Sequence, residues 1–141
     1  MNPSLTLVGA DLSPIIRSSY SSELSISSAS FLGTDCAAQQ YYYEALQFTV
    51  AVNGSFAFYS ESVMDTIGSI HVGSFNPLNL SVNRIAGEKS EFRRGELGLR
   101  ISTQINNTYV LVVTTKVPQT LGNFTIIVFG PAHVELQRIS K

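Results

Sequence analysis

The sequence predicts an all-β domain: a two-sheet antiparallel β-sandwich, similar to a jelly roll, with about eight or nine strands. Three observations lead to this fold class. Apolar and polar residues alternate with period two in several short stretches, and no stretch sustains a 3.6-residue period with helix-capping signals. Turn residues such as Gly, Pro and Asn recur about every 8–12 residues. With 141 residues, the chain suits one domain with one core.

The stretch from Tyr41 to Ser60 is expected to form the central hairpin of the domain. Its apolar residues recur at every second position on both sides of Asn53-Gly54. An Asn-Gly pair between two alternating stretches is the usual signal for a two-residue hairpin turn. We therefore expect two long paired strands here, with the other strands added around them.

The N-terminal part is expected to stand apart from the sandwich. Residues 1–21 are interpreted as a linker or an added strand, and residues 22–141 as the β-sandwich domain. The short alternating piece containing Leu5, Leu7 and Val8 ends before Pro14, which breaks a strand. In the Ser-rich stretch that follows, alternation predicts a half-exposed strand over Glu23–Ser27.

After the hairpin, the sequence predicts a turn and a strand over residues 64–72, with His71 at an edge or on the surface. Gly73–Asn83 is the longest loop candidate, and long loops on rigid scaffolds often bind ligands. A short strand, Arg84–Ala86, precedes a charged segment, Gly87–Gly95, that is expected to be a solvated loop.

The sequence of the C-terminal third predicts four strands. Leu97–Thr103 alternates and is expected to be half-buried. Tyr109–Thr115 and Phe124–Phe129 are apolar on both faces, which places them in the middle of sheets. Val134–Ile139 has a polar outer face and is expected at an edge.

Composition favours an extracellular or cell-surface protein. Charged residues make up 13% of the chain and the formal net charge is −1, so no electrostatic footprint for nucleic acid is present. Ser, Thr, Asn and Gln occupy the polar positions. No secretion signal and no membrane-spanning stretch is recognisable in the sequence. Acceptor patterns for N-glycosylation begin at Asn53, Asn79, Asn106 and Asn123.

No pattern in the sequence indicates an enzyme. A nucleophile elbow, a zinc-ligand spacing and a phosphate-binding loop are all absent from it. Cys36 is the sole cysteine, so no internal disulfide can form, and we expect a half-buried free thiol. Neither His71 nor His133 is close to it in sequence, as a base for a nucleophilic cysteine would need to be.

Aromatic residues at two places are candidates for ligand binding. The run Tyr41, Tyr42 and Tyr43 places rings on both faces of one strand, so at least one face is expected to be partly exposed. Tyr rings stack on sugars and anchor interfaces, although they also pack the rim of a sandwich. Phe75 and Asn76, in the long loop, complete the candidate set.

Three stretches resemble a known family: residues 41–45, then residues 64–66 with Gly73-Ser74-Phe75-Asn76-Pro77, then residues 108–115 with residues 122–128 and Gly130-Pro131. Together they are similar to jelly-roll domains of the bacterial pre-peptidase C-terminal type, and more closely to repeated domains of large rotifer surface proteins. The resemblance covers about residues 22 to 139. It implies a non-catalytic accessory module for adhesion or for contact with carbohydrate or protein.

Related modules often hold Ca²⁺ in an acidic loop, and this chain departs from that pattern. The corresponding loop mixes Glu88 and Glu91 with Lys89, Arg93 and Arg94, whose cations oppose a divalent ion. We therefore expect no bound cofactor. If Ca²⁺ did bind, Asp65 and Glu61 could contribute to the site.

Two functions remain open at this stage. The first is a module that binds a glycan or a surface protein through the tyrosine run and the long loop. The second is a structural subunit that assembles with copies of itself when Leu5, Leu7 and Val8 add a strand to a neighbouring sheet. Neither function involves nucleic acid or insertion into a membrane.

Overall fold

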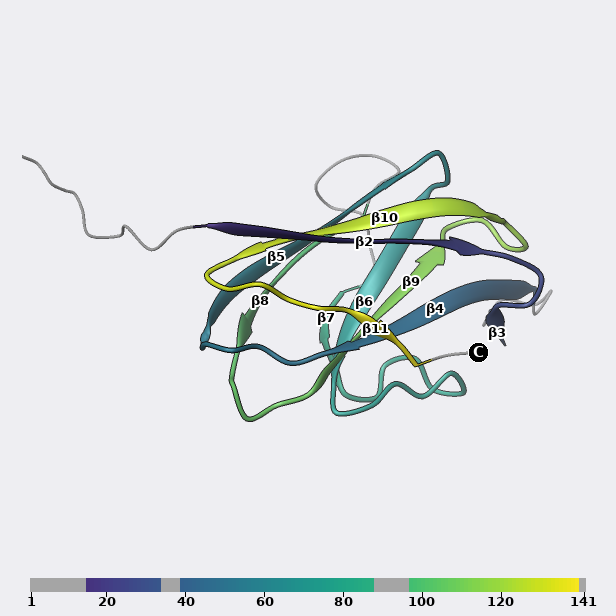
Figure 1. Ribbon diagram of the computed structural model, residues 1–141. Coiled ribbons are helices and arrows are strands. Elements are labelled where there is room, and N and C mark those ends of the chain that lie inside the picture. Colours follow the sequence, from purple (N-terminus) through teal and green to yellow (C-terminus); the bar gives the residue numbers. More distant parts are fainter. Residues whose placement is uncertain (1–14, 34–38, 88–96, 140–141) are drawn as a thin grey trace, which may run out of the picture.

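A computed structural model describes residues 15–33, 39–87 and 97–139. Over these ranges the chain forms ten β-strands in two antiparallel sheets and no helix (Figure 1). The predicted fold class, an all-β two-sheet sandwich, is confirmed. In chain order the strands are β2 (Ile16–Leu24), β3 (Ala29–Leu32), β4 (Gln40–Phe48), β5 (Gly54–Ser62), β6 (Thr66–Val72), β7 (Arg84–Ala86), β8 (Gly98–Thr103), β9 (Tyr109–Thr115), β10 (Gly122–Gly130) and β11 (Gln137–Arg138).

The two sheets enclose one main core. The first sheet has the order β2-β10-β5-β8, and the second has the order β11-β4-β9-β6-β7, with β3 also paired to β4. Figure 1 shows β2 and β10 in the upper layer of the view and β4 in the lower layer. As predicted, the two doubly apolar stretches are central: β10 lies between β2 and β5, and β9 lies between β4 and β6. Every residue of β9 is buried.

The predicted central hairpin is wrong. β4 and β5 do not pair with each other, because β4 belongs to the second sheet and β5 to the first. Residues 49–53 carry the chain from one layer to the other. The apolar positions of the two strands therefore meet across the core, where the ring centroids of Phe48 and Phe58 are 5.1 Å apart.

The Asn53-Gly54 pair does not form a hairpin turn because it lacks the backbone conformation for one. A type I′ turn needs positive φ at both central residues, and neither Asn53 nor Gly54 has it. The Asn53 side-chain oxygen instead accepts a hydrogen bond from the Ile105 backbone N–H at 2.8 Å. Gly54 begins β5 opposite Thr103. The pair thus marks the start of a strand that crosses to the other sheet.

The Ser-rich N-terminal stretch forms a longer and earlier strand than predicted. β2 spans Ile16–Leu24, and residues 25–28 form a turn rather than the second half of a strand at Glu23–Ser27. Residues 16–21, assigned above to a linker or added strand, pair with β10 along their whole length. The inward serines are tolerated because each has a hydrogen-bond partner, such as the Val134 N–H, which donates to Ser18 Oγ at 3.0 Å.

The last predicted strand is shorter than expected. Within Val134–Ile139, Gln137 and Arg138 alone form a strand, β11, which pairs with β4 at the edge of the second sheet. Val134 and Leu136 instead lie in the main core. The segment must first cross between the layers, and its apolar residues fill the space there.

A buried carboxylate connects the two sheets. Glu44 of β4 is 2% exposed and faces the core side of β2. The Tyr20 hydroxyl donates a hydrogen bond to Glu44 Oε2, and the Ser22 hydroxyl donates one of 2.8 Å to Oε1. Burial, the hydrogen bond to Glu44 and the negative charge of Glu44 together raise the pKa of Tyr20 above its ordinary value, and the hydrogen bond with Ser22 and the charge of Arg138 partly oppose this rise.

We expect this contact to make folding stability fall in alkaline solution. Because the pKa of Tyr20 is raised in the folded state, its stabilisation is fully present below pH 10.0, the ordinary tyrosine value, and is lost as pH rises through the folded pKa. Tyr20→Phe should cost about 1 to 2 kcal/mol at neutral pH, since Glu44 loses a donor. Urea unfolding of both proteins from about pH 8 to about pH 11, a range that spans the ordinary tyrosine pKa, measures the alkaline loss of stability and the cost of the substitution.

The pH dependence separates the contribution of the ionisable Tyr20 hydroxyl to stability from the contribution of its ring. Tyr43, whose pKa burial also raises, contributes to the alkaline fall in both proteins. The difference in unfolding free energy between wild type and Tyr20→Phe should therefore shrink as the Tyr20 hydroxyl ionises. A constant difference across this range would contradict the role assigned to Glu44.

Candidate functional site

The outer face of the second sheet carries a small apolar cluster of its own. Side chains of β4 and β9 that point away from the main core are buried there: Tyr43, Ala45, Val110 and Val112. Apolar side chains on an outer face need a cover, because exposing them to water is unfavourable. Two segments provide it.

The first cover is β3, which pairs with the start of β4. This pairing places Phe31 over the sheet, with its ring 5.7 Å from that of Tyr41 in a stacked arrangement and 5.5 Å from that of Tyr43. Gly33 lies directly behind Tyr41. A β-carbon at position 33 would be 2.7 Å from Tyr41 Cε1, so a glycine is needed for this ring position.

The second cover is the loop between β6 and β7, residues 73–83. Its Phe75 ring packs edge-on against Tyr43 at 5.3 Å and against His71 at 4.9 Å. Positive φ angles at Gly73 and Asn83 turn the chain at the two ends of the loop. The predicted long loop is therefore a folded element that lies on the sheet.

The prediction of an edge or surface position for His71 is wrong, since this side chain is 0% exposed. β6 lies between β9 and β7, and the loop covers its outer face. His71 Nδ1 donates to the Val82 carbonyl at 2.9 Å, because a carbonyl can only accept. Nε2 is 2.8 Å from Ser69 Oγ. The imidazole thus attaches the end of the loop to the sheet.

Between the two covers lies a groove of about 210 Å³, which we call the aromatic groove. Aromatic and aliphatic side chains form most of its lining, and Lys116 is its one charged lining residue in the described part of the chain. Ser69 and Thr114 also line it, and their hydroxyls already bond to His71 Nε2 and to the Tyr42 carbonyl. Its main side chains are Phe31, Tyr41, Ile67, Phe75, Leu80 and Lys116.

The structure brings part of the predicted binding set together. Tyr41 and Phe75 line the aromatic groove, and Tyr43 forms the buried base on which Phe31 and Phe75 pack. Tyr42 lies on the opposite face of β4 and packs against the main core. Asn76 is exposed in the loop, where its side-chain oxygen accepts the Leu78 N–H at 2.9 Å.

Sequence reasoning missed Phe31 and Lys116. Phe31 follows a Ser-rich stretch, and its four-residue strand shows little alternation on which to base a prediction. Lys116 is next to a central strand but is exposed, and its backbone N–H donates to the Asp65 carbonyl at 2.9 Å. Phe31 is brought to the groove by the pairing of β3 with β4, and Lys116 by its backbone bond to Asp65.

The other candidate residues lie elsewhere. Asp65 and Glu61 are exposed near the turn between β5 and β6, and the described residues include no group of three or more potential metal ligands. Each of the four glycosylation acceptors is exposed: Asn53, Asn79, Asn106 and Asn123. Cys36 and the assembly candidates Leu5, Leu7 and Val8 lie outside the described residues, as does the charged loop from Glu88 to Gly95.

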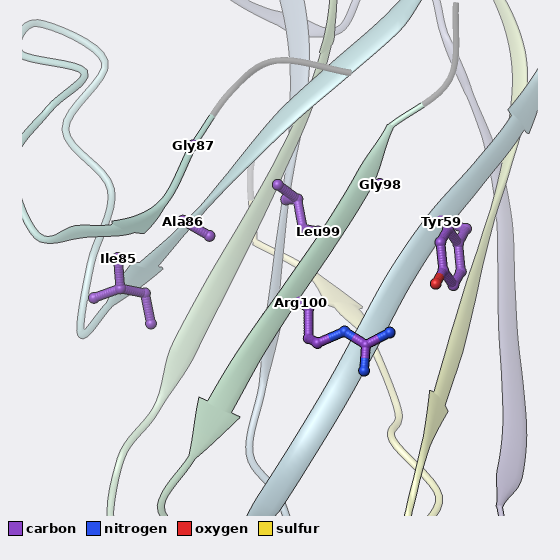
Figure 2. A pocket seen from close by; sticks show the side chains of 7 residues that line it. All are labelled: Tyr59, Ile85, Ala86, Gly87, Gly98, Leu99 and Arg100. Atoms are coloured by element: carbon purple, nitrogen blue, oxygen red, sulfur yellow. The ribbon is translucent and has the colours of Figure 1, made fainter. Parts of the chain in front are cut away.

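A second hollow, of about 450 Å³, lies where β5, β7 and β8 approach one another. Figure 2 shows Ile85, Ala86 and Gly87 on one side of it and Tyr59, Leu99 and Arg100 on the other. Its rim at Gly87 and Gly98 adjoins residues 88–96, which are not described. We therefore build no site on it.

No family model and no curated protein matches this chain. In the part of the chain that is described, no helix has the length and apolar character needed to cross a membrane.

The two neighbouring tyrosines should respond differently to truncation. Tyr42→Ala removes a ring that packs against the main core and should cost about 2 to 4 kcal/mol of unfolding free energy. Tyr41→Ala removes a ring from a partly open groove and should cost about 1 kcal/mol. Chemical denaturation of both variants measures the difference, and equal losses would contradict the assignment of the two faces.

Proposed function

We propose that this chain is a non-catalytic binding module that holds one sugar unit of a glycan in the aromatic groove. The observation that carries the proposal is the convergence of the Phe31, Tyr41 and Phe75 rings around a hollow that is also lined by Ser69, Thr114 and the exposed Lys116. Sugars present apolar C–H faces to aromatic rings and hydroxyls to polar groups. A groove with both kinds of wall suits them.

The size of the groove favours one protruding unit of a larger ligand. Sites for small organic ligands usually enclose about 300 to 1,000 Å³. The aromatic groove, at about 210 Å³, is smaller than these. The terminal residue of a glycan chain could enter it while the rest of the chain stays outside.

The rigidity of the walls also supports binding. Phe75 packs on Tyr43 and His71, and Tyr41 lies between Phe31 and Gly33. Side chains that are already fixed lose little conformational entropy when a ligand binds. The groove therefore needs little reorganisation to accept a ring.

An adhesive role outside the cell fits the rest of the chain. Ser, Thr, Asn and Gln dominate the polar positions, and the four glycosylation acceptors are exposed. The resemblance to domains of the pre-peptidase C-terminal type, and to repeats of rotifer surface proteins, favours the same role. On this proposal the partner is a glycan on a cell surface or in an extracellular matrix.

Screening on an array of neutral and acidic oligosaccharides, followed by calorimetric titration of the strongest hit, tests this function. Phe75→Ala should weaken binding about tenfold or more, because it removes one wall of the groove. Leu78→Ala is the matched control, since Leu78 lies in the same loop and is 94% exposed. It should leave both binding and stability unchanged.

Failure to bind any oligosaccharide on the array would overturn the proposal. Equal effects of Phe75→Ala and Leu78→Ala would move the binding site away from the groove. Circular dichroism of each variant shows whether the fold is retained, so that lost binding can be assigned to the groove.

A further inference from the structure

β2 is a long and regular edge strand. It lies at the outside of the first sheet, next to β10 (Figure 1). All nine of its residues pair with β10 in an unbroken register. On its other side, no backbone hydrogen bond joins it to any residue that the structure describes. With respect to the described residues, this edge therefore presents a row of backbone donors and acceptors that have no backbone partner.

The other edges of the described sheets are protected in the ways that natural proteins use. β7 has three residues and an irregular register with β6, β11 has two residues, and β3, which pairs with β4 alone, has four. β8 has six residues and lies close to β7 of the other layer. Short strands, bulges and covered edges all prevent pairing with another chain. β2 contains no proline and no bulge.

The sequence of β2 is complementary to itself when read in the opposite direction. In an antiparallel pair of two β2 strands centred on Tyr20, Arg17 faces Glu23 of the second copy. Apolar residues face each other at the ends, and serines face serines between. The opposed pairs are Ile16 with Leu24, Arg17 with Glu23, Ser18 with Ser22, Ser19 with Ser21, and Tyr20 with Tyr20.

The backbone of β2 has the correct phase for this register. The Ser60 N–H donates to the Leu97 carbonyl, so Ser60 and the other even-numbered residues of β5 direct their backbone groups toward β8. Odd-numbered residues of β5 therefore bond to odd-numbered residues of β10. Even-numbered residues of β10 in turn bond to even-numbered residues of β2. The backbone N–H and C=O groups of the odd-numbered residues of β2 therefore point away from β10. These residues are Arg17, Ser19, Ser21 and Glu23.

We infer that two copies of this chain pair edge to edge through β2, in antiparallel register around a two-fold axis at Tyr20. In this register the outward backbone groups of Arg17 bond with those of Glu23 of the second copy, and those of Ser19 with those of Ser21. By symmetry, the same bonds form a second time with the two copies exchanged. The first sheets join into one continuous sheet. Arg17 and Glu23 are both exposed on its outer face, where opposite charges directly across a strand pair attract.

The two-fold axis of such a pair is perpendicular to the joined sheet. Both copies therefore carry their second sheet, and its aromatic groove, on the same side. Two grooves that face one surface would bind a multivalent glycan with avidity. This last consequence rests on the proposed function, whereas the pairing itself does not.

Sedimentation analysis of the full chain over about a hundredfold concentration range tests the pairing. Wild type should show a monomer–dimer equilibrium. Arg17→Glu alone, or Glu23→Arg alone, places like charges opposite each other at two positions of the dimer. Each should raise the dimer Kd about tenfold or more. The double variant restores the opposite charges and should restore wild-type dimerisation.

Two further variants separate this edge from other surfaces. Arg100→Glu changes an exposed arginine on the same outer face but on β8, and should leave the equilibrium unchanged. Ser19→Pro removes an outward N–H and should give monomers that remain folded by circular dichroism. A wild type that stays monomeric overturns the inference, as does a double variant that dimerises no better than the single ones.

Discussion

The second sheet is apolar on both faces, and most of the molecule follows from that constraint. Every residue of β9 is buried, with alternate side chains in the main core and in the outer cluster. One face is covered by the first sheet. The other needs a separate cover, which β3 and the loop after β6 supply with Phe31 and Phe75. The aromatic groove lies between these two covers, where the sheet is not fully enclosed.

The main core contains polar groups that the sandwich satisfies by pairing across the layers. Glu44 points inward from β4 and accepts hydrogen bonds from Tyr20 and Ser22 of β2. An unpaired carboxylate at this depth would carry a large desolvation cost. The same contacts explain how a strand as rich in serine as β2 can form the side of a sandwich. They also fix which residues of β2 face inward.

Sequence reasoning succeeded where a strand's environment is encoded in its own residues. β7 and β9 have the predicted bounds, and the alternation of β8 predicted its half-burial. It failed for the supposed hairpin, because alternation is the same in two strands that pair and in two strands that face each other across a core. The same limit applied to Tyr42, since a run of three tyrosines does not reveal which ring faces the core.

Positions that depend on how another segment folds onto them could not be predicted from the local sequence. His71 is buried because residues 73–83 fold back onto β6, and no neighbour of His71 in the sequence indicates this. Phe31 reaches the groove because β3 pairs with β4. Half of the candidate site could therefore be predicted. Tyr41 and Phe75 could be chosen as aromatic residues near a strand end and in a long loop, but their convergence with Phe31 depends on the fold.

The inward and outward residues of β2 have different explanations. Ser18, Ser22 and Leu24 are accounted for by contacts inside the sandwich. Arg17 and Glu23 point outward, and their charges contribute nothing to that interior. Their equal spacing about Tyr20, on an edge whose backbone groups also point outward, is what antiparallel pairing of two identical strands requires. The interior thus explains why β2 can be a strand, and the pairing explains why its exposed residues have this order.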